Sequence, residues 1–187
     1  MAPSKPVIAA LLCAASWMSA AGAADAELMT AQEAFQQLGV PYVPFDVRQA
    51  AMPEEEKGFL AQFFELIEQA VIERVQTMQV LSSSADADVH VNEFQAIEQR
   101  IRGLQVPSRL QDVHALVLSA IGEERMAIEQ WRMRMQAGQS VDIRTDPLVQ
   151  SSSAKLHQAY QTLMGLYPAE SRNREAMERH LCALDFL

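Results

Sequence analysis

Apolar residues recur at intervals of three and four along most of this chain, which is the spacing of an amphipathic α-helix. The pattern is clearest between Pro107 and Ala137, where the stripe consists of Leu110, Val113, Val117, Ile121, Ile128, Trp131 and Met135. A second long stripe, between Pro53 and Leu81, consists of Leu60, Phe63, Ile67, Val71, Met78 and Leu81. Half-buried strands alternate apolar and polar residues instead, and that period does not describe these stretches. The fold class is therefore predicted to be all-α.

Caps and breakers divide the second part of the chain into helices. Prolines that favour the first helical turn and glycines that end helices predict helical segments over 53–81, 91–102, 107–137, 146–166 and 169–186. The connections between them are short, which favours antiparallel neighbours. We therefore expect residues 53–187 to form an up-and-down bundle of four to five long helices.

A shorter unit precedes the bundle, over residues 24–52. Thr30-Ala31-Gln32-Glu33 has the pattern of a capping box, and Gly39 is a natural stop, so a short helix is expected between them. The following segment, Val40 to Val47, contains two prolines that impose an extended conformation. We expect this helix and this proline-containing segment to pack on the outside of the bundle.

The first 23 residues have the features of a secretory signal peptide. Lys5 supplies the charged start, residues 7–18 are uncharged and mostly apolar, and Ala21-Gly22-Ala23 is a small-x-small cleavage pattern. The apolar stretch is shorter than the roughly 20 residues of a membrane span, which disfavours an uncleaved anchor. The sequence therefore predicts an exported protein, periplasmic or secreted, with no transmembrane segment after cleavage.

Charge and cysteine content narrow the function further. The formal net charge is −9, and no basic patch stands out, which argues against nucleic acid and anionic membranes as partners. Cys13 lies in the predicted leader, so the mature chain keeps only Cys182 and cannot form an internal disulfide. Stability must therefore come from packing.

Three polar residues interrupt the apolar stripes. Glu124 falls in the middle of the stripe over 107–137, and Arg74 has the same place in the stripe over 53–81. His180 lies at the centre of the last apolar face, beside Met177 and Leu184. An isolated buried charge costs many kcal/mol, so each charge needs a partner. We expect Arg74 and Glu124 to form an ion pair, and His180 to complete a polar layer with them.

This layer has two interpretations. It can be a structural ion pair that fixes the register of the helices, or a ligand-binding site made of Arg74, Glu124 and His180. We favour the structural interpretation, because buried charges with shifted pKa values mark functional sites in only some proteins.

The sequence also lacks the common signatures of catalysis and of metal or cofactor binding. The sequence has no His-Glu-x-x-His, no Cys-x-x-Cys and no Glu-x-x-His pair, and it lacks a glycine-rich phosphate loop. Cys182 and His180 point to opposite sides of one helix and cannot form a dyad within it. We therefore predict no metal site and no cofactor.

The helical pattern also predicts whether several other residues are buried or exposed. Met135 is expected to fill the core, whereas Met126, Met133 and His157 are expected at the surface. Ser152 is expected to permit close approach of a neighbouring helix.

Together these features predict a non-enzymatic, exported helical bundle. We expect it to act by contact with an unidentified envelope or extracellular protein. The alternative is a bundle that binds a small ligand or a metal in its buried polar layer.

Overall fold

The computed structural model describes residues 29–81, 84–170 and 173–187, so the predicted signal peptide lies outside the described residues. The described chain is all-helical and contains no strand, which confirms the predicted fold class. Its α-helices are α1 (Ala31–Gln37), α2 (Glu54–Val80), α3 (Ser84–Arg102), α4 (Gln111–Gln136), α5 (Pro147–Leu166) and α6 (Arg174–Leu184).

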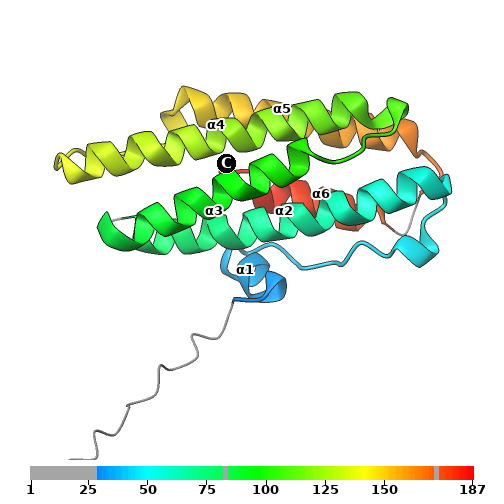
Figure 1. The fold of residues 1–187 in the computed structure, drawn as a ribbon, viewed down its shortest axis with the longest axis horizontal. Helices are drawn as coiled ribbons and strands as arrows, with labels where there is room; N and C mark the ends of the chain where they lie inside the picture. The colour runs from blue at the N-terminus through cyan, green and yellow to red at the C-terminus, as the bar shows by residue number, and fades with distance from the viewer. Residues whose placement is uncertain (1–28, 82–83, 171–172) are drawn as a thin grey trace, which may run out of the picture.

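The four long helices α2 to α5 lie lengthwise beside one another, and successive helices run in opposite directions (Figure 1). Helix α3 contacts α2 and α4, and α5 contacts α4. The shorter α6 contacts both α2 and α5, and α1 lies against α2 on the outside of the bundle (Figure 1). We call the end of the bundle where α2 and α4 finish and α5 begins the distal end.

Local sequence signals set several helix ends. The Thr30 side chain accepts a hydrogen bond from the Glu33 amide (3.2 Å), and the Glu33 carboxylate accepts one from the Thr30 amide (2.8 Å), so the predicted capping box is present. Asp146 caps α5 through the Leu148 amide (2.9 Å), one residue before Pro147.

One predicted helix start is wrong, and two others lie a few residues later along the chain. Helix α3 begins at Ser84 rather than near residue 91, because Ser, Asp and Ala are acceptable in the first turns of a helix, where negative charge also favours the dipole. A 3₁₀ turn over Ser108–Leu110 precedes α4, and α6 begins only at Arg174.

The extended segment after α1 is tied to the bundle by hydrogen bonds at several points, and we call residues 40–52 the strap. The Asp46 amide donates to the Asn173 side chain (2.8 Å), and that side chain donates back to the Asp46 carbonyl (3.1 Å). The Ala51 amide donates to Glu170 (2.7 Å). These bonds satisfy backbone groups of a segment that has no ladder partner of its own.

The apolar core has two parts. The main cluster fills most of the bundle, and a smaller cluster at the distal end consists of Leu81, Val91, Ala127, Ile128, Trp131 and Val149. Along α4 and α5 the two clusters are separated by one buried polar residue each, Glu124 and Ser152, and on α2 the buried Arg74 and Thr77 lie on either side of Val75, near the same boundary. The interior therefore contains a polar layer, though with Ser152 in the place expected for His180.

Candidate functional site

Glu124 is fully buried in this layer. Its Oε1 lies 3.1 Å from the Ser152 hydroxyl, and its Oε2 has no hydrogen-bond partner among the described residues. Burial raises the pKa of the Glu124 carboxyl well above its ordinary value, and the charge of Arg74 and the hydrogen bond from Ser152 oppose this only in part. The environment thus favours the protonated carboxyl.

The contacts of the Ser152 hydroxyl are consistent with a protonated Glu124 carboxyl. It also lies 3.3 Å from the Val149 carbonyl, and a hydroxyl has a single hydrogen to donate. A protonated Glu124 can donate to Ser152, which leaves the serine hydrogen for the Val149 carbonyl. This chain of two hydrogen bonds places a neutral acid in the core without a buried ion.

Arg74 is also buried, yet it does not form the predicted direct ion pair with Glu124. Among the described residues, no nitrogen of Arg74 comes within hydrogen-bond or ion-pair distance of the Glu124 carboxyl. Its Nη1 instead donates to the carbonyl of Ala183, and its Cζ lies 4.2 Å from the centre of the Phe186 ring. The two residues still interact electrostatically.

The reason for this placement is the end of α6. Carbonyls in the last turn of a helix have no intrahelical donor, and a cation there also complements the helix dipole. Arg74 supplies a hydrogen-bond donor and a positive charge to the end of α6, at the carbonyl of Ala183. Burial lowers the pKa of Arg74, and the charges of Glu124 and Asp185 work against that shift. Arg74 is therefore a side-chain cap that links α2 to the end of α6.

His180 belongs to a different cluster. Its Nδ1 lies 2.7 Å from the Ala176 carbonyl, which can only accept, so Nδ1 carries a hydrogen. Its Nε2 lies 2.8 Å from Oε1 of Glu68, which also accepts from the Tyr42 hydroxyl (3.1 Å). Burial and the negative charge of Glu68 raise the pKa of Tyr42 to about 12. This Tyr42–Glu68–His180 cluster joins the strap to α2 and α6.

The three predicted site residues are thus all buried, but they do not form one site. Arg74 and Glu124 lie in the polar layer, and no described contact joins His180 to either of them. Sequence reasoning missed Ser152 as a partner of Glu124, although it interrupts the stripe of α5 as Glu124 interrupts that of α4. The contacts of Glu68 with Tyr42 and His180 depend on how the strap packs against the bundle. The helical period of the sequence does not predict that packing.

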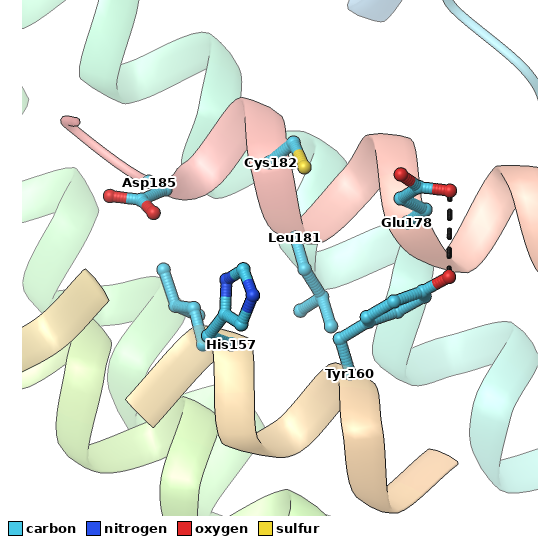
Figure 2. A pocket seen from close by; sticks show the side chains of 7 residues that line it. His157, Tyr160, Glu178, Leu181, Cys182 and Asp185 are labelled. Carbon is cyan, nitrogen blue, oxygen red and sulfur yellow. Dashed lines mark hydrogen bonds between the residues drawn. The ribbon is translucent and has the colours of Figure 1, made fainter. Parts of the chain in front are cut away.

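A separate small pocket lies between α5 and α6 (Figure 2). It has a volume of about 180 Å³, and its lining is Leu156, His157, Tyr160, Glu178, Leu181, Cys182 and Asp185. Tyr160 points across it to Glu178, with 3.5 Å between the hydroxyl and the carboxylate (Figure 2). This pocket brings a thiol, an imidazole and two carboxylates to one place.

The chemistry of this pocket does not suit nucleophilic catalysis. Cys182 is exposed, yet partial desolvation raises the pKa of its thiol, and the charges of Glu178 and Asp185 raise it further while Arg179 opposes them. The reactive species is the thiolate, so this environment makes the thiol a weak nucleophile at neutral pH. Among the described residues, no three His, Cys, Asp or Glu side chains are grouped so that they could hold a metal ion.

No family model matches the chain, and neither a curated protein sequence nor a solved structure is significantly similar to it.

A mainly apolar concave surface lies at the distal end, and we call it the distal groove. It consists of two open cavities of about 320 and 350 Å³, which share Met78 and Ile143. Trp131, Met135 and Val141 line the first cavity, and Leu38, Val75 and Phe186 line the second.

Met135 is 37% exposed, so its predicted core position is wrong. Helix α4 extends beyond the buried Trp131, and Met135 belongs to this projecting part. Met126 (39% exposed) and Met133 (58%) lie at the surface as predicted.

The segment from Trp131 to Thr145 differs in charge from the whole chain. Residues 131–145 contain three arginines and one aspartate, a formal charge of +2, whereas the whole chain carries −9. Arg134 precedes Met135 and Arg144 follows Ile143; both are exposed, and neither makes an ion pair with a described residue. None of the described helices is long and apolar enough to cross a membrane.

Proposed function

We propose that this chain is a non-enzymatic, exported protein that acts by binding another protein at its distal end. The observation that carries the proposal is the distal groove, where methionines and other apolar side chains stay accessible at the end of an otherwise polar, acidic bundle. Methionine-rich surfaces adapt to partner side chains because the thioether is flexible and polarisable. Export is proposed from the sequence of residues 1–23.

The alternative, a ligand or metal site in the polar layer, has weaker support. Glu124 is fully buried and hydrogen-bonded to Ser152, Arg74 serves the end of α6, and His180 contacts Glu68. Each of these contacts has a structural explanation. The raised pKa of the Cys182 thiol likewise gives no support to an enzyme that uses it as a nucleophile.

The proposal is tested by site-specific photo-crosslinking in the cell that produces the protein. A photoreactive residue in place of Met135, which is exposed and lines the groove, is expected to give a discrete crosslinked protein. The matched control places the same residue at Gln95, exposed on α3 away from the distal end, and is expected to give none. If no surface position yields a crosslinked protein, the proposed function is wrong.

A further inference from the structure

His180 is fully buried at the place where α1 and the strap meet the bundle. Its Nδ1 donates to the Ala176 carbonyl (2.7 Å), and its Nε2 lies 2.8 Å from Oε1 of Glu68. A neutral imidazole has one donor and one acceptor, so a neutral ring would turn a lone pair toward that carboxylate oxygen. The contact with Glu68 is therefore attractive only when a proton lies between the two atoms.

The segment before α2 supplies much of the cover over this imidazole. The ring centres of Phe35 on α1 and Tyr42 on the strap lie 5.3 and 6.3 Å from that of His180, and Phe64 on α2 lies at 5.2 Å. Because the His180 side chain has no exposed surface, water cannot satisfy an unpaired Nε2 while the strap is in place. Glu68, in contrast, is 22% exposed, so water can solvate its charge. We therefore assign the shared proton to the imidazole.

Tyr42 ties the strap to the same carboxylate. Its hydroxyl donates to Oε1 of Glu68 at 3.1 Å, the oxygen that also faces His180. Burial and the charge of Glu68 raise the pKa of Tyr42 to about 12, so the phenol keeps its hydrogen over the range of about pH 5 to 8 in which an imidazole ordinarily titrates. In the described part of the chain, Glu68 and Tyr42 are the titratable side chains in contact with the His180 ring.

The other charged groups near α6 have partners elsewhere. Arg179 lies 3.6 Å from Glu175, and Arg74 of α2 donates to the Ala183 carbonyl. The remaining titratable side chains between α5 and α6 line the separate pocket, which His180 does not line: His157, Tyr160, Glu178, Cys182 and Asp185. Helix α1 contributes only the uncharged Phe35 to the contacts of this ring.

We propose that His180 is a pH-sensitive latch, which holds α1 and the strap on the bundle while its imidazole is protonated and loosens them when the proton is lost. Loss of the proton leaves two acceptors in contact, so the Glu68 carboxylate turns toward the solvent that it already touches. Tyr42 then loses its acceptor, and the strap loses a contact with the bundle. The stabilisation is present at low pH and is lost as pH rises, so the strap is closed more firmly in acid than in alkali.

Hydrogen exchange followed by mass spectrometry tests the latch on the chain lacking residues 1–23. The Asp46 and Ala51 amides donate to the side chains of Asn173 and Glu170, so a peptide that contains both amides reports opening of the strap. Its protection, corrected for the intrinsic exchange rate at each pH, is expected to fall at least about tenfold between about pH 5.5 and 8.

Two histidine variants separate the latch from other effects of pH. His180→Gln keeps a donor for Glu68 but cannot titrate, so strap protection is expected to change less than about twofold over the same range. His157→Gln, an exposed change on α5, is the matched control and is expected to keep the pH dependence of the wild type. Glu124, whose pKa is raised, is present in all three proteins, so the difference between them isolates His180.

Tyr42→Phe gives a second test, which decides the matter if circular dichroism shows that His180→Gln does not fold. It removes the hydroxyl that binds Glu68 and leaves the aromatic ring, so the strap is expected to be as weakly protected in acid as the wild type is in alkali. Strap protection in the wild type that is constant or rises with pH would overturn the latch. The same pH dependence in His180→Gln, or in Tyr42→Phe, as in the wild type would overturn it as well.

Discussion

The burial of Glu124 was predicted correctly from the sequence, but its hydrogen-bond partner was not. Its burial follows from the helical period, because every third or fourth residue of α4 faces the core. Its partner does not follow, because the same period says nothing of which neighbouring helix lies nearest. The structure gives it Ser152 as its hydrogen-bond partner rather than the guanidinium of Arg74, and its burial raises the pKa of the carboxyl.

The shifted pKa of Glu124 predicts a pH-dependent cost in stability. Below the ordinary carboxyl pKa of 4.5, both the folded and the unfolded chain hold the proton, and the group costs nothing. As pH rises from there to the raised pKa of the folded state, the unfolded chain releases its proton first, and stability is lost. Glu124→Gln cannot lose a proton, so its stability relative to wild type is expected to grow by up to about 1.4 kcal/mol per pH unit.

Urea unfolding of both proteins between pH 4.5 and 8 measures this difference. Glu93→Gln, an exposed change on α3, serves as control and is expected to differ little from wild type throughout. A difference that shrinks as pH rises would mean that Glu124 is held as a carboxylate, and would restore the ion-pair interpretation.

The strap is the segment whose structure the helical pattern of the sequence predicts least well. Its two prolines predict an extended conformation, but the residues that hold it come from the far end of the chain, at Glu170 and Asn173. Neither residue has a distinguishing sequence pattern, since an acid and an amide before a helix look like ordinary capping residues. The helices themselves were predictable because their stripes are long. Their starts were less so, as α3 and α6 show.

Removing the Asn173 side chain is expected to loosen the strap without unfolding the bundle. Asn173→Ala loses both hydrogen bonds to the Asp46 backbone, which contribute on the order of 1 kcal/mol each. Trypsin cleavage after the exposed Arg48 is then expected to become about tenfold faster, as followed by mass spectrometry. Asn92→Ala, an exposed change on α3, is expected to leave the rate unchanged, and equal rates in all three proteins would show that Asn173 does not restrain the strap.

At the scale of the molecule, the polar layer divides the bundle into a large and a small apolar cluster. The small distal cluster contains Trp131, whose indole donates to Asp146 at 2.8 Å. Fewer apolar contacts support it than support the main core, so local opening there costs less free energy.

This division predicts that the distal end unfolds first. The chain without residues 1–23 has Trp131 as its single tryptophan, so fluorescence reports the small cluster and circular dichroism reports all helices. The fluorescence midpoint in urea is expected at least about 0.5 M below the dichroism midpoint. Glu124→Met, which makes the layer apolar, is expected to bring the two midpoints closer. Coincident midpoints in the wild type would show that both clusters unfold as one unit.

The turn at Gly138 affects which surface residues of this protein can vary during evolution. Its backbone has a φ of 72°, a conformation that favours glycine, and it sends the chain away from α4 directly after the helix ends. Residues 139–145 then lead to α5, and Val141 and Ile143 within them pack against the distal cluster. The exposed Gln139 and Ser140 also line the groove, so substitutions at these two positions would alter the surface that we propose binds a partner while the apolar contacts of Val141 and Ile143 are kept, which would let natural selection retarget the protein at little cost to the bundle.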